Sequence, residues 1–154
     1  MQITFTLKTW QKLVLLPEVM EYLDQFRQKE TGMPESGGQL FFKLVENDIH
    51  ICQATGPYKT DRQSRFLFEP DKKKQAADIK SHFKKGLHFL GDWHTHPEES
   101  PTPSQMDLAS MNDCFARSKH ELESFLLLIL GTSPGRAGMW MSLHYKNGGV
   151  IRLQ

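Results

Sequence analysis

The run Phe125–Leu130, FLLLIL, is the feature that most restricts the fold of this 154-residue chain. Six consecutive apolar residues are too few to span a bilayer as a helix, which takes about 20. A run of this length, apolar on both faces, instead predicts a strand in the interior of a sheet that is covered on both sides.

Shorter patterns on either side of this run predict alternating strands and helices. We expect strands in the following segments, the last two forming a closing hairpin at Asn147-Gly148: Ile3–Leu7, Leu40–Val45, Ile49–Gln53, Phe66–Phe68, Leu87–Trp93, Ala137–Tyr145 and Gly149–Leu153. In the strand Leu87–Trp93, the residues Leu87, Phe89, Gly91 and Trp93 alternate with His88, Leu90 and Asp92. The polar stretch Ala54–Arg65 is expected to be a mobile loop.

Three segments have helical spacing. The first begins at Pro17 and should end near Lys29 or Glu30, and the second covers Asp71–Lys85, with Ala76, Ala77, Ile79 and Phe83 on its inner face. The third begins at Ser104. The predicted class is therefore α/β with α+β character: a mixed β-sheet flanked by helices, in a single domain spanning residues 1–154.

Composition excludes several kinds of partner. The 19 basic residues are balanced by 18 acidic ones, so no nucleic-acid-binding surface is expected. The N-terminal segment lacks the apolar region of a signal peptide, and we expect a cytoplasmic protein without a membrane anchor. Cys52 and Cys114 are far apart and form no CxxC pair, which argues against a disulfide framework and against a cysteine-based zinc site.

The stretch Gly91–Asp107, GDWHTHPEESPTPSQMD, contains the candidate chemistry. His94 and His96 should project from the same face of a strand, because residues i and i+2 point the same way. Asp107 lies about one turn into the following helix, which can fold back toward the two imidazoles. Two imidazoles and one carboxylate suit a zinc ion that keeps a fourth position open for water.

Each part of this pattern also has an ordinary structural explanation. Ser104 and Asp107 fit a capping box at the start of a helix, and an isolated H-x-H pair is a weak indication of a metal. The remaining histidines have no metal-ligand spacing and are expected at the surface or satisfied in the core: His50, His82, His88, His120 and His144.

The complete pattern H-x-H-x7-S-x2-D, formed by His94, His96, Ser104 and Asp107, resembles the signature of JAMM metallopeptidases, also called the MPN+ or JAB-domain family. That family also has an upstream glutamate near a glycine-rich start of a strand, and Glu35 in ESGGQLFF occupies this place. The resemblance covers nearly the whole chain and is closest to short prokaryotic members.

The resemblance implies a role for each of these residues. His94, His96 and Asp107 would bind one Zn²⁺ per chain. Glu35 would be the general base, which takes a proton from the zinc-activated water and delivers it to the leaving amine. Ser104 would donate a hydrogen bond to the developing oxyanion.

The resemblance also implies a zinc isopeptidase that cuts the amide bond after the C-terminus of a ubiquitin-like modifier or of a conjugated protein. Short prokaryotic members accompany conjugation enzymes, including those of antiphage systems in which a cGAS-like nucleotidyltransferase is conjugated. The alternatives are a peptidase that trims the tail of a sulfur-carrier protein and a non-catalytic MPN scaffold module. A zinc deaminase would need a PCxxC segment that the sequence lacks.

Overall fold

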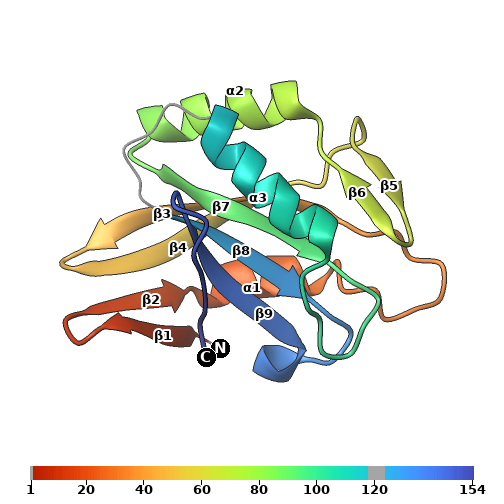
Figure 1. Ribbon diagram of the computed structural model, residues 1–154, viewed down its shortest axis with the longest axis horizontal. Helices are drawn as coiled ribbons and strands as arrows, with labels where there is room; N and C mark the ends of the chain where they lie inside the picture. The colour runs from red at the N-terminus through yellow and green to blue at the C-terminus, as the bar shows by residue number, and fades with distance from the viewer. Residues whose placement is uncertain (1, 118–123) are drawn as a thin grey trace.

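An eight-stranded mixed sheet forms the centre of the molecule in the computed structural model, which describes residues 2–117 and 124–154 (Figure 1). Expectations for two residues lie outside what the structure describes: His120, and the side chain of Cys114. The strands of the sheet are β1 (Ile3–Lys8), β2 (Gln11–Leu15), β3 (Gly37–Val45), β4 (Asp48–Thr55), β7 (His88–Thr95), β8 (Ser124–Leu130), β9 (Met139–Tyr145) and β10 (Val150–Arg152).

The strand order is β1-β2-β4-β3-β7-β8-β9-β10, so β7 and β8 lie in the interior as the apolar run predicts. The β2–β4 and β7–β8 pairs are parallel, and the remaining neighbours are antiparallel, which confirms the mixed sheet. Strands β5 (Arg62–Ser64) and β6 (Leu67–Glu69) form a separate antiparallel hairpin. A short 3₁₀ helix, η1 (Gly135–Gly138), precedes β9.

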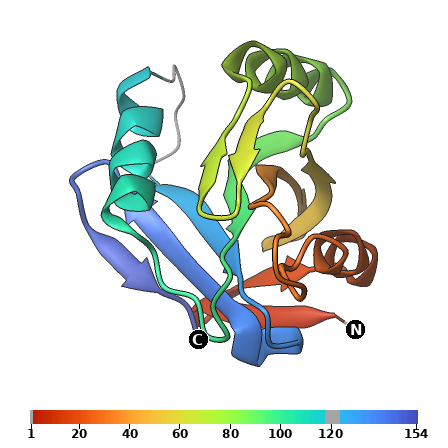
Figure 2. The ribbon, with the colours of Figure 1, turned by 90° about the vertical axis from the view of Figure 1, so that its right-hand side faces the viewer.

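Helices cover both faces of this sheet. Helix α1 (Pro17–Asp24) lies against one face, and α2 (Lys72–Lys84) and α3 (Gln105–Arg117) lie on the other (Figure 2). Strand β8 contributes side chains to the core on both faces of the sheet. Its residues Leu126, Leu128 and Leu130 pack in one cluster with Val19, Met20 and Leu23 of α1. The alternate residues Phe125, Leu127 and Ile129 pack against Met111 of α3. The prediction of a strand buried on both faces is therefore confirmed.

A bulge in β7 changes the predicted alternation of this strand. Leu40 pairs with Gly91 but Phe41 pairs with Phe89, so Leu90 is an extra residue without a partner on β3. Phe89 consequently faces the α3 side, whereas Leu90 and Trp93 enter the α1-side core. Gly91 is required beside the bulge, because a Cβ there would lie 1.9 Å from the carbonyl oxygen of Leu126.

Helix α1 ends at Asp24, so its predicted extension to Lys29 or Glu30 is wrong. The chain leaves the helical path and places the Arg27 guanidinium in the interior, where the side chain is only 1% exposed. There it donates to the carbonyl oxygens of Gly131 and Gly138, at 3.0 and 3.1 Å, and also to those of Ser133 and Gly135. These bonds tie the end of α1 to the segment between β8 and β9.

Two further predictions need correction. The predicted loop Ala54–Arg65 contains β5, and its first two residues belong to β4. Helix α2 lies within the predicted segment Asp71–Lys85 and is capped by Asp71, but it buries no residue completely, and Ala76, Ala77 and Phe83 are exposed. Of the predicted inner face only Ile79 is half-buried, and it is accompanied by half-buried Gln75, Asp78 and His82. The His82 ring stacks on Phe41 of β3, and Asp78 accepts a hydrogen bond from Tyr58.

None of the helices within the described residues is long and apolar enough to cross a membrane.

Replacing Arg27 by methionine should lower the free energy of unfolding by about 3 kcal/mol, because several buried carbonyl groups lose their donor. Urea titration followed by circular dichroism measures the change. Arg62→Met is the matched control, since Arg62 forms an exposed ion pair with Glu69 at 3.2 Å. Its effect should stay within about 0.5 kcal/mol. Equal losses in the two variants would contradict the role given to Arg27.

Candidate metal centre

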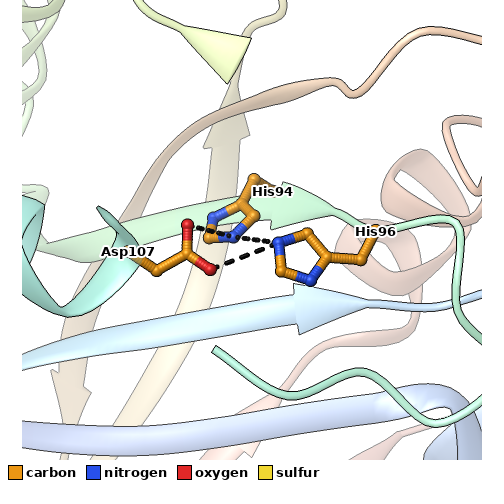
Figure 3. Close-up of side chains that lie close together, drawn as sticks. All are labelled: His94, His96 and Asp107. Carbon is orange, nitrogen blue, oxygen red and sulfur yellow. Dashed lines mark hydrogen bonds and ion pairs between the residues drawn. The ribbon is translucent and has the colours of Figure 1, made fainter. Parts of the chain in front are cut away.

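Three potential metal ligands meet at the end of β7 (Figure 3). Nε2 of His94 lies 3.1 Å from Oδ1 of Asp107, and Nε2 of His96 lies 3.2 Å from Oδ2 of the same carboxylate. The two Nε2 atoms are 3.2 Å apart. Within the described part of the chain, this is the one group of three histidine, cysteine or acidic side chains close enough to share an ion.

The backbone fixes both histidines at the end of the strand. Thr95 points away from them, and its hydroxyl accepts a hydrogen bond from the Ser36 amide at 2.9 Å. The amide of His96 donates to the carbonyl oxygen of Leu130, also at 2.9 Å, which continues the pairing with β8 beyond Thr95. The two imidazoles therefore point to the same side, as their spacing predicts.

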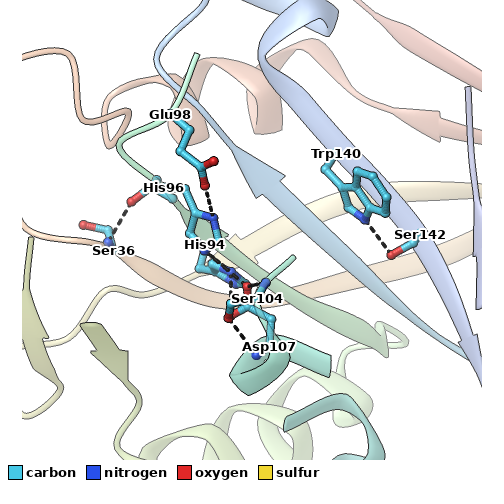
Figure 4. A network of polar contacts seen from close by, with 9 residues as sticks. Ser36, His94, His96, Glu98, Ser104, Asp107, Trp140 and Ser142 are labelled. Atoms are coloured by element: carbon cyan, nitrogen blue, oxygen red, sulfur yellow. Dashed lines mark hydrogen bonds and ion pairs between the residues drawn. The ribbon is translucent and has the colours of Figure 1, made fainter. Parts of the chain in front are cut away.

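Asp107 is held in place by the capping box at the start of α3 (Figure 4). The Asp107 amide donates to Oγ of Ser104 at 3.1 Å, and the Ser104 amide donates to Oδ2 of Asp107 at 2.8 Å. The capping interpretation is thus correct, and it does not compete with the metal interpretation. The same carboxylate completes the cap and faces both imidazoles.

The donor set fits a tetrahedral zinc ion. Zinc-ligand bonds of 2.0–2.1 Å imply separations of about 3.3 Å between the ligand atoms of a tetrahedron. The two Nε2 atoms are 3.2 Å apart, close to that value, and they lie 3.1 and 3.2 Å from different oxygens of the Asp107 carboxylate. One ligand atom from each of the three residues lies within 4.8 Å of the others. Two Nε2 atoms 3.2 Å apart need a proton or a cation between them, because two nitrogen lone pairs facing each other repel. The residues present therefore suit a metal.

Charge within the cluster favours an anionic aspartate beside a protonated histidine when no metal is bound. Burial opposes ionisation of Asp107, but hydrogen bonds from His94 and His96 outweigh it and hold the pKa of the carboxyl well below its usual range. Burial also opposes the charged form of His96, yet the neighbouring carboxylates, chiefly Asp107, raise the pKa of its imidazole. A metal that binds must displace this proton.

Glu35 lies just before β3 and lines the same cavity as the three ligands. Its backbone amide donates to the carbonyl oxygen of Ser64, and its own carbonyl oxygen accepts from Gln63 Nε2 at 2.8 Å. The residue is 8% exposed. Burial raises the pKa of its carboxyl to about 7; the positive charge of His96 opposes this rise, and the charges of Asp107 and Glu98 add to it.

The cavity has a volume of about 730 Å³ and passes between the β5–β6 hairpin and α3. Apolar side chains line this cavity together with the candidate ligands: Phe66, Leu67, Phe68 and Pro70 in or beside the hairpin, and Met106 in α3. Phe66 and Met106 are 73% and 63% exposed, which is unusual for large apolar side chains. The sequence patterns did not single out these apolar residues as a group, because they belong to separate elements.

Two polar contacts were also missed by sequence reasoning. Gln63 reaches Glu35 from the hairpin, and Glu98 places Oε1 3.1 Å from Nδ1 of His96. Glu98 lies within the motif, between His96 and Ser104, and a carboxylate two residues after a candidate ligand was the available signal.

His144 has the ordinary core environment expected of it. His144 is buried, its Nε2 lies 2.8 Å from the Ser142 hydroxyl, and burial lowers its pKa. Ser142 in turn accepts a hydrogen bond from Trp140 (Figure 4). Trp93 packs in the α1-side core and donates to the carbonyl oxygen of Thr55 at 3.0 Å.

Comparison with known proteins gives consistent similarities. Residues 21–143 match the family model for prokaryotic homologues of the JAB domain. The chain is 30% identical over 132 residues to a CD-NTase/cGAS isopeptidase of Vibrio cholerae serotype O1, covering 84% of this chain and 80% of that protein. A CD-NTase/cGAS isopeptidase of Escherichia coli is 28% identical over 138 residues, covering 88% and 83% respectively.

The solution structure of a protein from Desulfitobacterium hafniense has the same fold. Its TM-score is 0.64 at 24% sequence identity, and the match covers 90% of this chain and 87% of the other.

Asp107→Asn should weaken zinc binding by at least about 100-fold, because the substitution removes the anionic ligand while an amide oxygen can still accept the cap hydrogen bond. Competition with a fluorescent zinc chelator measures the affinity, and mass spectrometry of the metal content should give about one zinc per wild-type chain. Glu99→Gln, on the exposed loop nearby, is the control. Unchanged zinc affinity in Asp107→Asn would exclude Asp107 as a ligand.

Proposed function

The chain belongs to the family of prokaryotic JAB-domain proteins. We propose that it is a zinc-dependent isopeptidase. It hydrolyses the amide bond after the C-terminus of a conjugated protein, and the names of its relatives support a cGAS-like nucleotidyltransferase as that protein. The observation that carries the proposal is the convergence of His94, His96 and Asp107 in one cavity with Glu35.

Zinc held by His94, His96 and Asp107 would polarise the scissile carbonyl group and make water more acidic. The chain's own residues supply the remaining steps. The Glu35 carboxylate takes the proton of the attacking water and returns it to the nitrogen of the leaving amine. Its raised pKa suits this exchange, because a base with a pKa near 7 both accepts and releases a proton readily at neutral pH.

Ser104 serves two purposes in this proposal. Its Oγ accepts the hydrogen bond that caps α3, and its own hydroxyl hydrogen remains available to the substrate. We assign that hydrogen to the oxyanion that forms on the carbonyl oxygen. The exposed apolar side chains of Phe66 and Met106, which both line the cavity, provide surface for an extended protein tail beside the reacting bond.

The assignment is tested on conjugates of a cGAS-like nucleotidyltransferase. Incubation with the wild-type protein should release the intact enzyme and its former target, and mass spectrometry should place the cut directly after the last residue of the nucleotidyltransferase. A cut within the tail of a sulfur-carrier protein, with the conjugates left intact, would favour the trimming alternative. Cleavage of neither substrate by the zinc-loaded protein would favour a scaffold.

Glu35→Gln should lower kcat by about 10²- to 10⁴-fold while zinc binding is retained, because the amide cannot accept the proton of water. In the wild type, kcat should fall as the pH is lowered, since Glu35 must be ionised to act as a base. The midpoint should lie at or below about 7, because a bound cation can only lower the pKa that burial raises. Wild-type activity in Glu35→Gln at neutral pH would exclude this role.

A further inference from the structure

Glu98 stands outside the ligand set and outside the catalytic steps proposed above, yet it contacts a candidate ligand directly. Its Oε1 lies 3.1 Å from Nδ1 of His96, the ring nitrogen that faces away from His94 and Asp107 (Figure 4). His96 is buried, whereas the side chain of Glu98 is 51% exposed. The carboxylate can therefore keep its charge in contact with water while it accepts a hydrogen bond from an imidazole in the interior.

The backbone holds Glu98 in position for this contact. The carbonyl oxygen of Glu98 accepts a hydrogen bond from the Thr132 amide at 2.8 Å, just beyond β8. Gly131 allows the close approach, because a Cβ at that position would lie 2.2 Å from the same carbonyl oxygen. The loop after His96 is thus fastened to the end of β8, and the His96 amide is bonded to Leu130 in the same region.

The contact between Glu98 and His96 affects which nitrogen of the imidazole can bind a metal. A neutral imidazole that presents the Nε2 lone pair to a metal must keep its proton on Nδ1. A carboxylate that accepts from Nδ1–H selects this tautomer, orients the ring and makes Nε2 a stronger donor. We infer that Glu98 is a positioning residue, which fixes His96 in the tautomer that binds zinc.

This inference rests on the proposed metal-dependent function, but its test uses zinc affinity. Glu98→Ala should weaken zinc binding by about 10-fold, the lower end of the range for such contacts, because half of the Glu98 side chain is in water. Chelator competition at constant pH measures the affinity, and circular dichroism of the metal-free variants checks that they are folded.

Two further variants separate positioning from other roles. Glu98→Gln should restore most of the affinity, since its amide oxygen can still accept from Nδ1–H. Glu99→Ala removes the neighbouring exposed carboxylate and should bind zinc as the wild type does. A simple effect of local negative charge would instead lower the affinity in all three variants, and it would overturn the inference.

The outcomes distinguish this inference from the proposed function. Zinc affinity in Glu98→Ala equal to that of the wild type would overturn the role of Glu98 and leave the isopeptidase proposal intact. The same holds if Glu98→Ala only raises KM for the conjugate, because Glu98 would then contact substrate. A wild-type protein that binds no zinc would overturn both.

Discussion

The candidate site depends on the place of β7 between β3 and β8. Because β3 runs antiparallel to β7, its beginning lies beside the end of β7, where His94 pairs with Gly37. Ser36 and Thr95 are 59 residues apart in the sequence, and the hydrogen bonds between them bring Glu35 to the cavity that contains the histidines. On the other side, β8 runs parallel to β7 and supports His96 and the following loop. Strand β7 thus lies between two segments that are distant in the sequence, the start of β3 and the end of β8.

Negative charge in a partly enclosed space is the second determinant of the site. Acidic residues lining the cavity outnumber its single lysine, Lys72. These negative charges repel the Glu35 carboxylate and attract the protonated His96 imidazole, so they contribute to the raised pKa of both groups, although burial is the larger influence on Glu35. A divalent cation would relieve this repulsion and take the place of the proton shared by the imidazoles. The base and the ligands are therefore coupled electrostatically as well as by the backbone.

Patterns that depend on neighbouring residues were readable from the sequence. The buried strand at Phe125–Leu130, the common face of His94 and His96, and the capping box at Ser104 all follow from local periodicity or local hydrogen bonding. The position of Glu35 came from resemblance to a family, because nothing local distinguishes it from a solvated loop carboxylate.

Features set by distant contacts were not readable. The early end of α1 follows from the bonds of Arg27 to a segment more than 100 residues away. The extra residue Leu90 is evident only once β7 is paired with β3. The contact between Glu98 and His96 is close in sequence, yet it depends on the loop being fastened to Thr132.

The most direct test of the central claim is anomalous diffraction at the zinc absorption edge from crystals of the zinc-loaded protein. We predict a single strong peak about 2.0–2.1 Å from Nε2 of His94, from Nε2 of His96 and from a carboxylate oxygen of Asp107. A peak at other residues, or direct hydrogen bonds persisting among these three side chains with no peak between them, would contradict the account.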